Sequence, residues 1–171
     1  MKYDQSIINY AMYINSLEYG GTVDVTLPVI KYKTVSMTGA GIAGEMEEPV
    51  MGHIDPMTCQ IKFRNLTREG AIIMAPGQHQ IEFRGAREDF DTESGAKIYV
   101  PMKYVMVVEA LEHNVGTLAP QSGSDGTGTF AVHKFMAFEA GRKFIDIDPA
   151  NYKHEIDGVD YLAAARYAMG K

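Results

Sequence analysis

The chain has 171 residues, of which 46% are hydrophobic and 22% charged, as is typical of a globular domain with its own core. A net charge of −6 disfavours non-specific binding to nucleic acid or to anionic lipid. The single cysteine, Cys59, excludes an intrachain disulfide, and we find neither an export signal nor an apolar run long enough to span a membrane. We therefore expect one domain over residues 1–171, synthesised in the cytoplasm.

Alternation of apolar and polar residues with a period of two predicts the first strands. It runs through Thr22–Leu27, continues without exception over Met57–Arg64, and recurs over Gln80–Arg84. Such alternation is typical of strands with one buried face. Between the first two strands, the glycine-rich segment from Met37 to Val50 is expected to be an exposed loop.

One short helix is expected in the middle of the chain. Asn65 or Thr67 could cap it, and it would run through Met74. The sequence Ala75-Pro76-Gly77 would end it, since proline and glycine both interrupt helices.

Two longer runs, Lys97–Leu111 and Thr127–Ala140, predict one long β-hairpin, because they are rich in β-branched and aromatic residues. In the second run we expect one face to be buried and to comprise Phe130, Val132, Met136 and Phe138. The connection from Asn114 to Gly126 is polar and glycine-rich, which predicts a mobile loop.

A helix is also expected at the C-terminus, with Asp160 as its N-cap and Gly170 at its end. The expected fold is therefore mainly β: an antiparallel β-sandwich or barrel with a short mid-chain helix and a C-terminal helix.

The segment Gly39–Gly44 matches the G-x-G-x-x-G pattern of dinucleotide-binding proteins. The context argues against that function. The preceding residues are too polar for a strand of a parallel sheet, and Glu45, Glu47 and Glu48 would place carboxylates beside the diphosphate. We therefore expect no cofactor.

No residues suggest a metal site or a catalytic site. The five histidines lack metal-ligand spacing, and the acidic segment Glu88–Glu93 lacks the pattern of a calcium loop, so we expect it to be a solvated turn. Cys59 alternates with inward-facing apolar residues, which predicts a buried and inert thiol. The chain is accordingly not expected to be an enzyme.

The order of several segments is more informative than any single motif. Val25-Thr26-Leu27-Pro28 is followed by the loop Gly39–Gly44 and by Gly85-Ala86. Lys143-Phe144-Ile145-Asp146-Ile147-Asp148 then precedes Ile156-Asp157-Gly158-Val159-Asp160 and a terminal helical segment. In this order the segments resemble the major tail tube proteins of contractile-tailed bacteriophages and of related phage-tail-like bacteriocins. The connection at Asn114–Gly126 departs from that family, where a more charged segment is expected.

The resemblance implies a structural subunit that forms hexameric rings, which stack into a hollow tube. The long strands would join an inter-subunit barrel. Its inter-ring loop would comprise Met37, Thr38, Gly39, Ala40, Gly41, Ile42, Ala43, Gly44, Glu45 and Met46. Its lumen-facing candidates are Lys103, Glu109, Thr129, His133 and Glu139.

The same resemblance implies partners and a location. Besides other copies of itself, the chain would contact a sheath protein, a baseplate tube initiator, a tail terminator and a tape-measure protein. DNA would meet it only in passage, and the subunit would reside in a virion tail or bacteriocin particle assembled in the host bacterium. Two alternatives remain open: a monomeric β-sandwich module that binds carbohydrate, which the absence of tryptophan disfavours, and an enzyme on a β-barrel.

Overall fold

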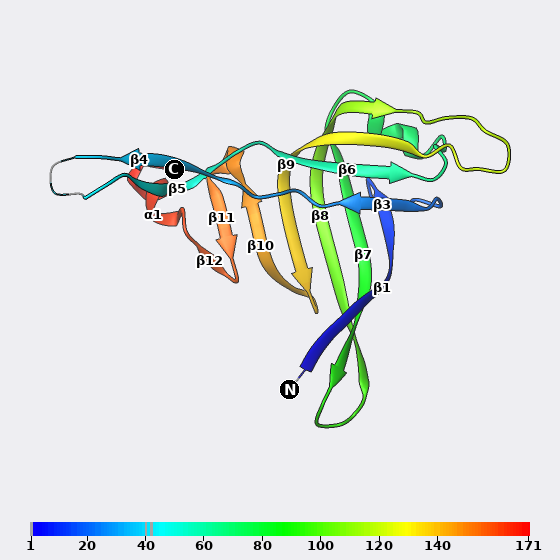
Figure 1. Ribbon diagram of the computed structural model, residues 1–171, viewed down its shortest axis with the longest axis horizontal. Coiled ribbons are helices and arrows are strands. Elements are labelled where there is room, and N and C mark those ends of the chain that lie inside the picture. Colours follow the sequence, from blue (N-terminus) through cyan, green and yellow to red (C-terminus); the bar gives the residue numbers. More distant parts are fainter. Residues whose placement is uncertain (1, 40, 42) are drawn as a thin grey trace.

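The computed structural model describes residues 2–39, 41 and 43–171, and confirms a mainly β fold built from antiparallel strands (Figure 1). The large sheet has the order β12-β11-β10-β9-β8-β7-β1-β2, and β6 joins it through β9 and carries β3 on its other edge. A separate two-stranded sheet contains β4 and β5. The strands are β1 (Lys2–Ile14), β2 (Leu17–Glu18), β3 (Val23–Thr26), β4 (Tyr32–Met37), β5 (Met46–Ile54), β6 (Met57–Phe63), β7 (His79–Asp91), β8 (Lys97–Asn114), β9 (Gly126–Glu139), β10 (Arg142–Asp148), β11 (Lys153–Ile156) and β12 (Val159–Asp160).

Strand β9 belongs to both layers of the fold because it changes partner along its length. Its first half, from Gly126 to Val132, pairs with β6, and its second half pairs with β10, while β8 lies on its other side throughout. The layer containing β6 and β3 therefore covers β1, β7 and β8, which makes the sandwich predicted from the sequence.

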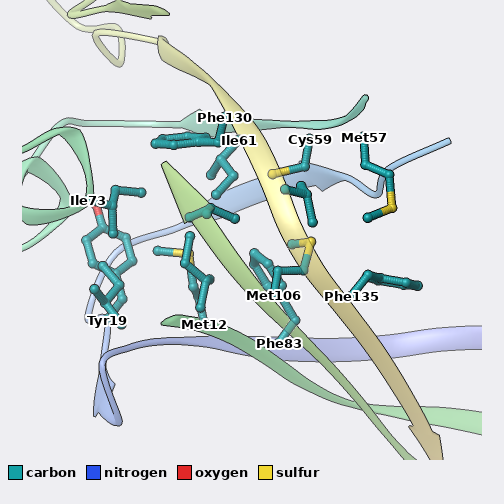
Figure 2. Close-up of a cluster of buried hydrophobic side chains, with 14 of the residues drawn as sticks. Met12, Tyr19, Met57, Cys59, Ile61, Ile73, Phe83, Met106, Phe130 and Phe135 are labelled. Carbon is teal, nitrogen blue, oxygen red and sulfur yellow. The ribbon is translucent and has the colours of Figure 1, made fainter. Parts of the chain in front are cut away.

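The core lies between these two layers (Figure 2). Strand β6 alternates strictly between buried and exposed residues, as its sequence predicts. Its inward side chains, which include Ile61 and Phe63, pack with Met12 of β1, Phe83 of β7 and Met106 of β8. Cys59 is buried among them, as predicted, and burial raises the pKa of its thiol to about 12. This thiol is therefore protonated at neutral pH.

A β-bulge changes which residues of β9 face the core. Val107 of β8 pairs with Lys134, but the next residue, Val108, pairs with Val132, so His133 has no Cα partner in this ladder. One additional residue reverses the inward and outward alternation beyond it. Phe135 and Ala137 are consequently buried, and the prediction that Met136 and Phe138 lie on the core face is wrong.

Both predicted helices exist as short segments. A 3-10 helix, η1 (Gly70–Met74), lies in the predicted mid-chain segment, and the Gly70 N–H donates a hydrogen bond of 3.1 Å to Thr67 Oγ1. Near the C-terminus, α1 (Ala163–Ala168) has Leu162 as its N-cap, so the prediction of Asp160 at that position is wrong; Asp160 Oδ1 instead accepts a hydrogen bond of 3.0 Å from the Leu162 N–H. A second 3-10 helix, η2 (Pro149–Asn151), was not predicted.

Two predicted irregular segments are partly strand. Strand β5 begins at Met46, so most of the second half of the expected loop Met37–Val50 is paired with β4. Strand β7 continues to Asp91, so the acidic segment is only partly a turn, and Asp89 within it is buried. Ladder pairing with β1 and β8 on both sides of β7 explains its extension.

Candidate assembly surfaces

Strands β4 and β5 form an arm that projects from the sandwich (Figure 1). Val35 and Met37 of β4 and Met46 of β5 are exposed on it, although all three are large and apolar. Single exposed apolar residues are common, but several on a thin projection make this surface a candidate for contact with another protein.

The predicted inter-ring segment forms the tip of this arm. Met37 ends β4 and Met46 begins β5, and they pair with each other. Gly41 and Gly44 have positive φ angles of 101° and 142°, which favour glycine in the reversal of the chain. Thr38, Gly39, Ala43 and Glu45 lie between the strands and are exposed, and Ser36 Oγ donates to Glu45 Oε1 at 2.5 Å. Ala40 and Ile42 lie outside the described residues.

Because this tip joins two antiparallel strands, the glycines lead into β5 and not into a helix. A dinucleotide fingerprint requires a helix N-terminus after the glycines to bind the pyrophosphate. The structure therefore provides a different context for the G-x-G-x-x-G pattern, that of an exposed hairpin.

A second surface is the face of strands β7 to β11 that points away from the core, which we call the outer face. Lys103, Glu109 and Thr129 lie on it by alternation, and His133 joins them because the bulge displaces it outward. His133 Nε2 lies 3.3 Å from Glu109 Oε2. Glu139 does not join this group, since it pairs with Met102 on the opposite face and contacts Arg87.

Lysine side chains and carboxylates alternate on the outer face of β10 and β11. The Nζ atoms of Lys143 and Lys153 each lie 2.7 Å from Asp146 Oδ2, and Glu155 lies within 3.4 Å of both. Burial by itself raises the pKa of Asp146, but the hydrogen bonds from the two lysines outweigh it, so this pKa lies below its usual value. The carboxylate remains charged at neutral pH, with its charge compensated by the lysines.

The ion pairs continue on neighbouring strands. Glu82 on β7 contacts Arg84 at 2.7 Å, and that hydrogen bond lowers the pKa of Glu82. Lys134 on β9 lies 3.7 Å from Asp148 on β10. Although the whole chain carries a net charge of −6, several carboxylates of the outer face are thus accompanied by cations.

A third surface is a three-stranded blade formed by the ends of β1, β7 and β8 that extend beyond the sandwich (Figure 1). Tyr3, Ile7 and Ile8 of β1 and Tyr99 of β8 are exposed on it. From Lys2 to Ala11, β1 pairs with β7 on one side, and the described residues supply no strand on its other side. This leaves an open sheet edge beside exposed apolar side chains.

His154 on β11 is buried beneath the base of the arm, where its Nε2 lies 3.0 Å from the Tyr32 hydroxyl oxygen. Burial lowers the pKa of His154, an effect that nearby Asp160 opposes without reversing it. The neutral imidazole is therefore favoured in the folded chain.

This shift predicts a loss of stability in mild acid. The unfolded chain binds a proton at His154 at higher pH than the folded chain does, so the free energy of unfolding should fall as pH drops below about 6.5. Urea unfolding between about pH 7.5 and about pH 5.5 would measure this slope. Carboxylates with lowered pKa values, such as Asp146 and Asp160, contribute only in stronger acid, near or below pH ~4.

The variant His154→Gln should lose most of this slope, whereas His53→Gln, at an exposed site on β5, should keep it. An unchanged slope in His154→Gln would assign the effect to another group.

A family model described as phage tail tube protein FII matches residues 4–170, which is nearly the whole chain. The chain belongs to the phage tail tube protein FII family. Proteins of this family are structural, so this tail tube protein is a structural component of a tail and not an enzyme.

Among the described residues no group of His, Cys, Asp or Glu side chains is arranged to hold a metal ion. No helix in those residues is long and apolar enough to cross a membrane.

Comparison with curated proteins gave no match. Among solved structures, this fold is similar to a chain in the cryo-EM structure of an extracellular contractile injection system, described as the PVC sheath/tube terminator in its extended state. The TM-score is 0.56 with 8% sequence identity, and the match covers 80% of this chain and 97% of the other. At this identity the likeness concerns the fold alone.

Proposed function

We propose that this tail tube protein forms hexameric rings, which stack into the hollow inner tube of a contractile tail. The observation that supports ring formation most directly is the open edge of β1. A long unpaired edge beside Ile7 and Ile8 would promote aggregation of a free protein. Pairing with a neighbouring copy in a closed ring removes that edge.

The lumen is proposed to be lined by the outer face, with Lys103, Glu109, Thr129 and His133 among its residues. This face lies on the long strands, and no second sheet of the described residues lies over it, since β3 and β6 cover the opposite face. Its paired charges would offer phosphates few uncompensated cations, so DNA could slide without being held. Glu139 is left out because it faces the other side.

The arm is proposed to contact the next ring through its tip, which includes Met37, Thr38, Gly39, Gly41, Ala43, Gly44, Glu45 and Met46. Its projection from the body and its exposed apolar residues support this role. Ala40 and Ile42 belong to the same proposed segment.

The remaining partners follow from the proposed place in a contractile tail. They are a sheath protein around the tube, a baseplate tube initiator, a tail terminator and, during assembly, a tape-measure protein within the lumen. The tube would carry DNA in a virion or perforate an envelope in a bacteriocin particle. Assembly would take place in the cytoplasm of the host bacterium.

Negative-stain electron microscopy of concentrated protein, together with its mass in solution, tests the proposal. Hollow rings or tubes of uniform width are expected. A subunit that stays monomeric even with sheath and baseplate proteins added would instead favour the monomeric carbohydrate-binding module.

Deleting Gly39–Gly44 and joining the arm strands by a short turn should leave a folded subunit that does not form tubes. The strands would still pair, as Met37 does with Met46, but the tip would no longer reach another ring. Circular dichroism would verify folding, and electron microscopy would detect tubes. As a matched control, shortening the other projecting turn at Thr92–Gly95 between β7 and β8 should not remove the arm contact. Normal tubes from the arm variant would contradict the stacking role.

A further inference from the structure

Among the described residues, the arm shares no strand pairing with the large sheet, so its direction must be fixed by other contacts. Strands β4 and β5 form a sheet of their own. At its base, the Asp55 N–H donates to the Lys31 carbonyl at 2.8 Å, which closes the hairpin but does not attach it to the body. Side chains at the base therefore determine how the arm leaves the sandwich.

The first such contact involves β5 and the C-terminal segment. Gly52 has a φ angle of +72°, and a Cβ atom placed there would lie 2.7 Å from Leu162 Cγ. Leu162 is 5% exposed, so its side chain is almost fully enclosed where it meets the Gly52 backbone. Because glycine has no side chain, the Leu162 side chain can pack directly against the backbone of the arm.

Leu162 is itself held by a network of hydrogen bonds around α1. Arg166 donates to the Tyr152 carbonyl at 2.7 Å and to Asp160 Oδ2 at 2.5 Å. The Tyr161 N–H donates to the His154 carbonyl at 2.9 Å. These bonds attach the residues around Leu162 to β11 and to η2, and so to the large sheet.

The second contact involves β4. The Tyr32 ring packs edge-on against His154 with 5.5 Å between ring centroids, in addition to the hydrogen bond described above. Beside it lies a cavity of about 330 Å³ between the arm and β11, lined in part by Val50, Met51 and Ile156. This cavity leaves part of the arm's base unpacked. Loss of either the Leu162 contact or the Tyr32 contact would therefore leave room for the arm to move.

We infer that Leu162 and Tyr32 are positioning residues. Their contacts attach the two strands of the arm to the C-terminal segment and so set the angle at which the arm meets the next ring. This inference rests on the proposed role of the arm in stacking. The C-terminal segment would then control the regularity of the tube without touching the neighbouring ring.

Hydrogen exchange of isolated full-length subunits tests the contacts of Leu162 and Tyr32 before any assembly occurs. In Leu162→Ala, amides of β4 and β5 should exchange about tenfold faster or more, while those of β6 in the core stay unchanged. Leu162→Met should restore slow exchange, because its side chain is of similar volume. The matched control is Tyr167→Ala on α1, the helix that follows Leu162. The Tyr167 side chain is 87% exposed, and this variant should leave the arm unchanged.

Tubes formed by the same variants should show the consequence for stacking. Cryo-EM of Leu162→Ala should show a wider spread of rotation between successive rings than the parent chain shows. Unchanged arm exchange would overturn the inference, as would faster exchange combined with tubes as regular as those of the parent.

Two further variants separate the possible causes of failure. If Leu162→Ala also accelerates exchange in β6, Tyr32→Phe, which removes only the hydroxyl group, takes its place with the same readouts. If the variant lacking Gly39–Gly44 forms normal tubes, the proposed stacking role of the arm is wrong. The exchange measurement still decides whether the contacts of Leu162 and Tyr32 hold the arm in place.

Discussion

Phe130→Ala is expected to lower the free energy of unfolding by about 3–5 kcal/mol, the usual cost of emptying a fully buried phenylalanine site. Phe130 is 0% exposed and lies on the part of β9 that pairs with both β6 and β8. Because strands enclose the site from two layers, the cavity cannot collapse easily. Equilibrium unfolding in urea would measure the loss.

The matched control is Phe138→Ala, on the same strand but beyond the bulge. Phe138 lies on the outer face, partly exposed, with Lys103 Nζ 4.6 Å from its ring centroid. Truncation there should cost clearly less, about 1–2 kcal/mol, since the side chain is already partly in contact with water. Equal losses at the two positions would mean that the bulge does not reverse the faces of β9.

Asp146→Asn is expected to destabilise the fold by about 3 kcal/mol at neutral pH, because it removes the negative charge that two ammonium groups share. The Asp146 side chain is almost fully buried, and its other oxygen, Oδ1, has no hydrogen-bond partner among the described residues. Lys143 and Lys153 would then face each other with only Glu155 to compensate them. Urea unfolding at neutral pH would measure the loss.

An exposed ion pair provides the comparison for this variant. Arg142 and Asp157 lie 2.7 Å apart, with side chains 73% and 69% exposed. Asp157→Asn should have little or no effect on unfolding, because water and salt screen charges at such a site. A similarly small effect in Asp146→Asn would show that the buried network does not stabilise the fold.

The sequence predicts the elements whose faces differ most in polarity. Strand β6 was predicted because its alternation is regular throughout, and the long β8–β9 hairpin because its two runs are rich in β-branched and aromatic residues. Both are present. The buried Cys59 follows from the same alternation. These predictions succeed because a single buried face imposes a period of two on a strand.

The predictions fail where pairing overrides local pattern. The bulge at His133 has no sequence signal of its own, since it depends on how β8 and β9 meet. Strand β1 and the short strands β10 to β12 were not predicted as strands. Most of β1 is exposed, so no burial pattern marks it, although it pairs with β7 along almost its entire length.

In the candidate surfaces, too, the sequence predicts local features and misses those that depend on pairing between strands. The glycines predicted an exposed loop, but the strands on either side of Gly41 and Gly44 were not recognised in such polar sequence. The network around Asp146 joins residues from two strands, and only the strand register brings them together. The contact between Gly52 and Leu162 is likewise visible only in three dimensions.

The arm is a ribbon of two strands, and the part of the chain that the structure describes places no third strand beside it. An isolated two-stranded ribbon in water is only marginally stable, because each strand satisfies its backbone groups on one side alone. A free subunit would therefore expose its arm to proteases more than any part of the sandwich. If the arm contacts the next ring as proposed, that contact should protect the ribbon, and the rate of cleavage would then report how far assembly has proceeded.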